Sequence, residues 1–340
     1  MKVEICSDRV AWDRYVEGEP GASNYHRWMW REAIEESFPH KAYYLAAMEG
    51  DGICGVLPLV HVRSRLFNDA LVSMPYLNYG GVLASQPRAA EALLREAAVL
   101  AQKLKVRHVE LRHRECNANN WVEATPKVTM EVALPANVDD MWNGLSSGMR
   151  NKIRGARNKQ ITVSWLEGIA VDEFYKVFSE NMRDLGTPIL PKKWFSNLSR
   201  YAAESVRFVI LQDGDETVAA GMTTSYRDCV ELPCSAALQK SRKKNTAILM
   251  YWSVFEWAHQ QGFKRVDLGR CTHGGGTWEF KRHWNPEEIK LHWYYWLSNG
   301  AQVPELRPDN PKFSMAVKVW KKLPLAAANA LGPRIAPSLP

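Results

Sequence analysis

The sequence predicts an α+β protein built from two tandem domains, each with a mixed, largely antiparallel sheet flanked by helices. The chain has 340 residues, more than one hydrophobic core usually supports, and its 46% hydrophobic content with 14 tryptophans is ample for two interiors. In addition, the same order of predicted elements (helices, hairpin strands, a long helix and a strand) occurs twice at a spacing of about half the chain, which indicates a duplicated domain.

The first half begins with helical periodicity and continues as an antiparallel meander. Residues 42–77 are β-rich and are broken by the turn sequence Glu49-Gly50-Asp51-Gly52. The helix that follows has Pro87 where a first turn tolerates proline. We expect helices at Tyr25–Phe38 and Arg88–Leu104, and strands at Val106–Arg112 and Val128–Leu134.

The second half repeats that order, with Asp213-Gly214-Asp215 as its hairpin turn. We expect helices at Val171–Asp184, Pro191–Ala203 and Thr246–Gln261, and strands at Arg207–Gln212, Val218–Tyr226, Cys229–Ala237 and Arg265–Leu268. The expected domains are residues 1–145 and 146–305, followed by a C-terminal helix and tail, 306–340, that packs back on them. The stripe Phe313, Ala316, Val317 and Trp320 lies opposite lysines, so a peripheral contact with the inner membrane leaflet is the alternative for this tail.

Composition limits the function classes. The chain carries 44 basic and 37 acidic residues, a net charge of +7, which suits anionic ligands without selecting one. The N-terminus has no continuous apolar stretch, so we expect a cytoplasmic protein. Six cysteines without a CxxC pair indicate free thiols, and the histidines form no HExxH pattern, so no metal site and no cofactor are proposed. There is also no GxSxG nucleophile motif.

A cationic helix is predicted between the two halves. Ser146 or Ser147 can cap it, and Arg150, Arg154 and Arg157 then fall on one face. No carboxylate intersperses these arginines within the segment 145–159, which favours an anion-binding ridge over a merely solvated surface.

Unusual residues are densest between Val266 and Trp284. A buried strand ends at Gly269, a glycine-rich loop follows, and a short helix presents Phe280 and Lys281. A lysine here can stabilise the oxyanion that develops during acyl transfer; the alternative is a surface lysine beside a plain loop. Asp267 and Arg270 are expected to pair and shape the turn.

The segment Ser73–Gly81 is a second candidate site. Tyr76, Asn78 and Tyr79 place polar aromatic groups and an amide before two glycines, a composition that can line an acceptor groove for a sugar or peptide. The alternative is a strand end and tight turn with buried tyrosines.

Four stretches together resemble the Fem family (FemAB-like) of aminoacyl- and acyltransferases, most closely its members associated with exosortase and exopolysaccharide gene clusters. They are Tyr25–Ile34, Ser73–Gly81, Met149–Lys159, and Asp267–Arg270 continuing to Trp278–Lys281. The resemblance implies two GNAT-like (acyl-CoA N-acyltransferase-like) domains, and transfer of an acyl or aminoacyl group onto an amine of an anionic cell-envelope precursor, as in peptidoglycan or exopolysaccharide synthesis.

The resemblance also implies roles for particular residues. Phe280 and Lys281 match the Phe-Lys pair that meets the tRNA end and the attacked carbonyl in peptidoglycan-building members. Arg31 and Arg150 or Arg154 are stand-ins for the basic residues that meet acceptor phosphates.

The donor and one rival function stay open. The long coiled-coil insertion of some Fem proteins is absent, which removes one argument for aminoacyl-tRNA and leaves acyl-CoA and acyl carrier protein as alternatives. Residues 239–245 lack the glycines that normally cradle the CoA pyrophosphate, which disfavours a CoA-dependent N-acyltransferase. The alternative from another class of protein is a non-catalytic protein of the same fold that binds anionic polysaccharide or RNA. DNA is not an expected partner.

Overall fold

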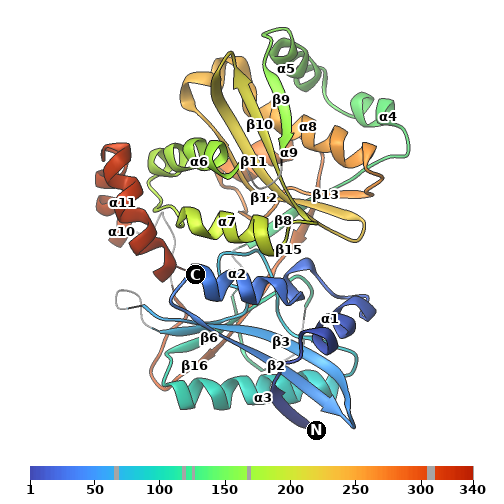
Figure 1. Cartoon of the computed structure of the whole chain (residues 1–340), viewed down its shortest axis with the longest axis vertical. Coiled ribbons are helices and arrows are strands. Elements are labelled where there is room, and N and C mark those ends of the chain that lie inside the picture. Colours follow the sequence, from blue (N-terminus) through green and yellow to red (C-terminus); the bar gives the residue numbers. More distant parts are fainter. Residues whose placement is uncertain (65–68, 117–119, 125–126, 167–169, 305–310, 340) are drawn as a thin grey trace. The chain divides into compact units, whose positions relative to one another are not determined.

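The computed structural model describes residues 1–64, 69–116, 120–124, 127–166, 170–304 and 311–339. They form two compact units, each built around one mixed sheet with helices on its faces (Figure 1). Unit 1 comprises Met1–Lys127, Lys290–Leu306 and Arg334–Pro340, and unit 2 comprises Val128–Ile289 and Arg307–Pro333. The predicted α+β class with two sheets is confirmed.

The sheet of unit 1 has the order β1-β2-β3-β4-β6-β16-β7, with β5 paired to β3. Its neighbours pair antiparallel except β4 and β6, which are parallel. The strands are β1 Lys2–Ile5, β2 Lys41–Glu49, β3 Gly52–Val62, β4 Ala70–Val72, β5 Leu83–Ala84, β6 His108–His113, β7 Val122–Ala124 and β16 His292–Leu297. The helices are α1 Arg9–Gly18, α2 Met29–Ser37 and α3 Pro87–Leu104.

Helices cover both faces of this sheet (Figure 1). On one face, apolar residues of α3 such as Leu93 share a core with Leu45 and Leu57 of the central strands. On the other, Trp12 of α1 lies 4.6 Å from the ring of Tyr44. The alternating side chains of β2 are therefore buried on both sides, which the β-rich run of the sequence allows. Helix α3 matches its predicted range, whereas Asn24–His26 forms a 3₁₀ turn ahead of α2.

The sheet of unit 2 has the order β14-β8-β13-β12-β11-β10-β9, with β15 paired to β8. Its strands are β8 Lys127–Ala133, β9 Thr162–Leu166, β10 Val206–Asp213, β11 Glu216–Tyr226, β12 Cys229–Ala237, β13 Arg265–Asp267, β14 Cys271–Thr272 and β15 Glu287–Lys290. Its helices are α4 Val138–Asn143, α5 Ser147–Arg157, α6 Val171–Leu185, α7 Lys192–Tyr201, α8 Thr246–Gln260 and α9 Gly276–Arg282. The 3₁₀ helix η3, Gln239–Lys244, precedes α8.

Two separate sets of apolar residues bury the faces of the second sheet. Phe174 of α6 and Phe195 of α7 pack with Phe208 of β10. Ile153 of α5 and Phe255 of α8 belong to a different core cluster. The predicted strands and helices of this half are all present, with ends that differ by a few residues.

The compact units differ from the expected ranges 1–145, 146–305 and 306–340. Strand β16 pairs with β6 along His292–Leu297, so a segment of the expected second domain completes the first sheet. Strand β8 pairs with β13, where Glu131 lies opposite Asp267, so a segment of the expected first domain belongs to the second sheet. Each sheet thus takes one strand from beyond the boundary, because pairing follows hydrogen-bond register rather than chain order.

The C-terminal segment forms α10 Pro311–Trp320 and α11 Leu325–Ile335. In unit 2, Val317 lies so close to Gly186 that a Cβ on this glycine would come within 2.6 Å of it, and Arg183 donates to the carbonyl of Leu323 at 3.1 Å. In unit 1, the carbonyl of Pro337 accepts from the hydroxyl of Tyr76 at 2.7 Å. Of the expected apolar stripe, the Phe313 side chain lies outside what the structure describes. No described helix has the length and apolar character needed to cross a membrane.

Candidate active site

The candidate site of unit 2 lies where two parallel strands part. Strand β12 pairs with β13 only from Cys229 to Glu231, and β12 then continues to Ala237 beyond the end of β13. Glu231 and Asp267, which lie opposite each other at the last paired position, are both buried. Buried carboxylates at a strand end are costly unless they are hydrogen-bonded, so this position is a candidate for function.

Asp267 organises the turn that follows β13. Its Oδ1 accepts from the hydroxyl of Thr129 at 2.5 Å and from the backbone N–H of Gly269 at 2.8 Å. Gly269 has a φ of +79°, a conformation that suits glycine. Asp267 therefore contacts the turn through Thr129 and Gly269, while its expected pairing with Arg270 stays a prediction.

The backbone of this turn accepts hydrogen bonds from Lys281. The Nζ of Lys281 donates to the carbonyl of Gly269 at 2.6 Å and to that of Arg270 at 3.3 Å. This lysine is 3% exposed, so the alternative of a surface lysine is wrong. Between this turn and α9, Gly274 has a φ of +72°, a conformation that suits glycine.

Burial sets the electrostatics of this lysine. Removal from water lowers the pKa of Lys281 below its ordinary value, while Cys271, Asp267 and Glu231 oppose that shift. The amine is thus removed from water, while the carboxylates of Asp267 and Glu231 favour its charged form. Such a group can donate a strong hydrogen bond to a developing negative charge, or accept a proton once it is neutral.

Phe280 fixes α9 on the rest of unit 2. Its ring meets that of Tyr251 edge-on at 5.0 Å, and Tyr251 stacks on Trp284 at 5.9 Å. The hydroxyl of Tyr251 is 3.1 Å from that of Ser235, in the part of β12 that extends beyond β13. Burial raises the pKa of Tyr251 to about 12, so this group stays protonated. Tyr251 and Ser235 were not predicted, because nothing in an apolar helix distinguishes a tyrosine that meets a strand from one in the core.

The cationic helix α5 is capped by Ser146, whose Oγ accepts from the N–H of Met149 at 3.3 Å. Arg157 is paired with Glu256 of α8, with N–O distances of 2.6 and 2.8 Å. The segment 145–159 itself holds no carboxylate, but Arg157 takes an acidic partner from a distant segment. Arg150 donates to the carbonyls of Asn143 and Leu145 at 3.1 and 2.7 Å.

Arg154 completes this face of α5. Its guanidinium lies 5.2 Å from the ring of Trp142 and donates to the side chain of Asn151 at 3.4 Å. Among the described residues, neither Arg150 nor Arg154 has an acidic partner. Both charges therefore stay uncompensated on the surface of α5 and suit an anionic ligand.

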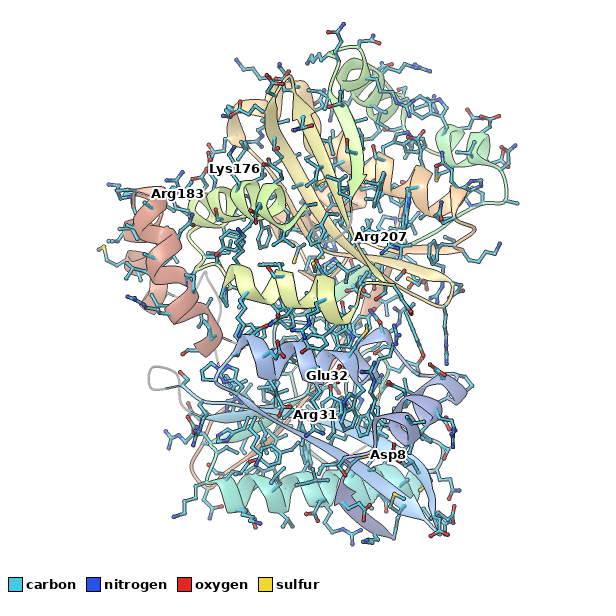
Figure 2. All side chains as sticks on the ribbon, in the orientation of Figure 1. Asp8, Arg31, Glu32, Lys176, Arg183 and Arg207 are labelled. Atoms are coloured by element: carbon cyan, nitrogen blue, oxygen red, sulfur yellow. The ribbon has the colours of Figure 1, made fainter. Side chains whose placement is uncertain are left out.

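Arg31 lies on α2 in unit 1 (Figure 2). It donates to Glu35 at 3.3 Å and to the carbonyl of Cys6 at 3.1 Å, and its guanidinium lies 4.6 Å from the ring of Trp28. An arginine held by a carboxylate, a carbonyl and an aromatic face stabilises the packing of α2. Binding a phosphate would require it to give up these contacts.

The segment Ser73–Gly81 is mostly interior. Asn78 and Tyr79 are buried, and Tyr79 meets the ring of Tyr25 edge-on at 5.3 Å. Tyr76 is half-buried; its hydroxyl lies 2.8 Å from His40 and donates to Pro337. These contacts favour the alternative of a tight turn with packed tyrosines over an acceptor groove.

A buried ion pair that the sequence did not reveal supports the same segment. Arg112, 1% exposed, is 2.7 Å from Glu110 and donates to the carbonyl of Leu77 at 3.0 Å. Tyr295 of β16 donates to Glu110 at 2.9 Å. The signal was present as two opposite charges two residues apart in one strand, a spacing that places both on one face.

Among the residues that the structure describes, no group of three or more His, Cys, Asp or Glu side chains is arranged to hold a metal ion.

The fold defines the class: the chain has the fold of the GNAT acyltransferases. Residues 147–282, which include α5 and Lys281, match the profile of the acetyltransferase (GNAT) domain. The whole chain is similar in structure to FemX, with a TM-score of 0.64 at 13% identity over 93% of this chain and 100% of that one.

Two further solved structures share this fold. L-PGS from Bacillus licheniformis has a TM-score of 0.58 at 12% identity, covering 95% of this chain and 100% of that one. The tandem GNAT protein of the clavulanic acid biosynthesis pathway has a TM-score of 0.56 at 10% identity, covering 89% and 99%. No curated protein matches the sequence. The predicted resemblance to the Fem proteins is thus confirmed as a shared tandem GNAT fold.

Proposed function

We propose that this chain transfers an acyl or aminoacyl group onto an amine of a cell-envelope or exopolysaccharide precursor, and that Lys281 stabilises the transition state. The observation that carries the proposal is the hydrogen-bonding of its amine. A protonated lysine has three N–H donors. Two are taken by the carbonyls of Gly269 and Arg270, and no described residue accepts the third. A buried, oriented donor of this kind suits an oxyanion.

The reaction forms one bond and breaks one. The acceptor amine attacks the carbonyl carbon of the donor ester or thioester, a C–N bond forms, and negative charge collects on the carbonyl oxygen. Lys281 donates its third hydrogen bond to that oxygen. When the carbonyl re-forms, the C–O or C–S bond to the carrier breaks, and the proton lost by the amine passes to the leaving oxygen or sulfur.

Two groups of contacts support this assignment. The turn that aligns Lys281 is held by Thr129, Asp267 and Gly269. The N–H donor of Lys281 therefore requires little reorganisation during the reaction. On α5, Arg150 and Arg154 are the proposed contacts for phosphate of the donor or acceptor, because both lack acidic partners among the described residues. Aminoacyl-tRNA, acyl carrier protein and acyl-CoA are the candidate donors.

The segment before α8 bears on the choice of donor. A bound pyrophosphate in this fold needs free backbone N–H groups at that helix start. Here η3 is closed by Asn245, with a φ of +58°, and the hydroxyl of Ser241 lies 2.7 Å from that of Thr246. Lys240 and Lys244 are paired with Glu216 and Asp213. These contacts favour a carrier other than CoA.

The experiment is a donor screen with a matched pair of variants. Transfer from labelled acyl-CoA, acyl carrier protein and aminoacyl-tRNA is measured for the wild type, Lys281→Ala and Arg282→Ala. Loss of an oxyanion donor should lower kcat by about 10²–10³. Arg282 is the adjacent cation on α9 and its side chain is 55% exposed. Within the described part of the chain its one carboxylate partner is Glu279, so its loss should leave kcat unchanged.

A Lys281→Ala enzyme within about threefold of wild type would contradict the catalytic role. If no donor supports transfer while Arg150 and Arg154 variants lose affinity for RNA or anionic polysaccharide, the chain is instead a binding protein of this fold. Saturable transfer from acyl-CoA would overturn the argument from η3.

A further inference from the structure

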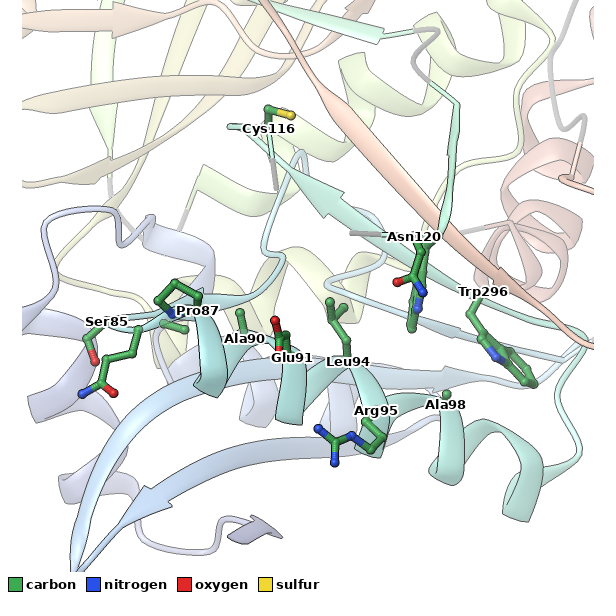
Figure 3. Close-up of a pocket in the computed structure, with 13 residues that line it drawn as sticks. Ser85, Pro87, Ala90, Glu91, Leu94, Arg95, Ala98, Cys116, Asn120 and Trp296 are labelled. Carbon is green, nitrogen blue, oxygen red and sulfur yellow. The ribbon is translucent and has the colours of Figure 1, made fainter. Parts of the chain in front are cut away.

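A groove of about 870 Å³ lies in unit 1, outside every contact used so far (Figure 3). One wall is formed by α3, and the other by Asn120, Trp121 and Trp296 of β16. Its volume is within the range of sites for small molecules, roughly 300–1,000 Å³. The lining residues are Ala84, Ser85, Gln86, Pro87, Ala90, Glu91, Leu94, Arg95, Ala98, Cys116, Asn120, Trp121 and Trp296.

Two tryptophans give the groove flat apolar surfaces. Val122 of β7 lies opposite Tyr295 of β16, and continuing this register by one residue places Trp121 beside Trp296. Both indoles are half-buried and pack against the core of unit 1, which fixes their orientation. The wall formed by α3 is shallow because Ala90 and Ala98 flank Leu94 at successive turns.

The polar groups of the groove are balanced in charge. Glu91 and Arg95, at i and i+4 on α3, contribute one negative and one positive charge, whereas the whole chain carries +7. Glu91, Arg95 and Asn120 have no hydrogen bond or ion pair to any other described residue, and all three side chains are exposed. Together they offer an acceptor, a donor, and an amide that does both.

We propose that this groove binds a short neutral saccharide. The flat faces of Trp121 and Trp296 match the apolar faces of pyranose rings, and sugar hydroxyls, which both donate and accept, match the mixed polar groups. A phosphate or carboxylate ligand would meet Glu91 without a surplus of positive charge. A second hollow of about 390 Å³ also has Glu91 and Arg95 among its lining residues.

The proposal is tested by calorimetric titration of the full chain with chitotetraose and cellotetraose, and with pyrophosphate as the anionic probe. We expect a neutral tetrasaccharide to bind with a Kd near ~1 mM, and pyrophosphate not to bind at this groove. Trp296→Ala and Asn120→Ala should each weaken binding at least about tenfold. Asn120 is exposed, so its variant is not compromised by loss of core packing.

The matched control is Trp165→Ala, which removes a half-buried indole of unit 2 that stacks on Trp257 at 4.5 Å. It should leave saccharide affinity unchanged. Three results would overturn the inference: no binding of either tetrasaccharide up to 10 mM, equal weakening by the Trp165 and Trp296 variants, or competition of pyrophosphate for the groove. Because the readout is binding, the inference stands or falls independently of acyl transfer.

Discussion

Replacing Arg112 by methionine should destabilise unit 1 by about 4 kcal/mol. The guanidinium is 1% exposed, lies 2.7 Å from Glu110, and donates to carbonyls of Leu77 and Met74 at 3.0 and 3.4 Å. Removing one member of such a pair leaves a buried charge uncompensated, which typically costs about 3–5 kcal/mol. A loss of this size is a large share of the roughly 5–15 kcal/mol that stabilises a domain.

The double variant Glu110→Gln/Arg112→Met separates the charge from the packing. Glutamine keeps an acceptor for the hydroxyl of Tyr295 but carries no charge. The double variant should therefore recover at least about 1 kcal/mol relative to Arg112→Met alone, although the carbonyls of Leu77 and Met74 still lack their donor.

The assay is hydrogen exchange followed by mass spectrometry, because the two units need not unfold together. Peptides from β6 and β16 report unit 1, and peptides from α8 report unit 2, which should not change. Arg282→Met, which removes an exposed ion pair, should change stability by less than about 0.5 kcal/mol. If the double variant is as unstable as Arg112→Met or more so, the buried charge is not the cause and the reasoning is wrong.

Two further predictions concern the turn at Gly81. A Cβ on Gly81 would lie 2.6 Å from the ring of His113, so Gly81→Ala should lower the free energy of unfolding in urea by about 1–3 kcal/mol. The control Gly148→Ala adds its Cβ in open space on α5 and should raise the free energy of unfolding by about 0.5–1 kcal/mol. Equal effects of the two variants would contradict the steric argument. Burial lowers the pKa of His26 to about 4, so between pH 6.5 and 4 the unfolded chain binds a proton that the folded chain excludes, and stability should fall by roughly 3 kcal/mol as the pH drops. His26→Gln should flatten this slope in urea titrations at pH 7 and 4.5, and an unchanged slope would exclude His26 as its source.

Local patterns predicted most elements, including the short helix that carries Lys281. Apolar periodicity located α3 and α8, and of the two serines expected as caps of α5, Ser146 is the one that caps it. The glycine turn beyond Asp267 does bury Lys281. These features depend on neighbours close in sequence, which is why they can be predicted from sequence alone.

Features set by distant partners were missed. The alternation in β6, with Glu110 and Arg112 between apolar residues, is typical of a half-exposed strand, but Trp293 and Tyr295 of β16 cover that face. Glu256 reaches Arg157 from 99 residues away. The residues of a strand do not show which sheet the strand joins, so the placement of β8 and β16 could not be predicted.

The origin of β16 has a consequence for how the chain is made on the ribosome. Strand β6 ends at His113, but the strand that lies beside it, His292–Leu297, is synthesised much later. At roughly 5–20 residues per second, the edge of β6 stays without that neighbour for on the order of ten to forty seconds. During that interval the unpaired edge of β6 exposes backbone hydrogen-bonding groups that can pair with other chains. We therefore expect this protein to depend on chaperones until β16 has been synthesised.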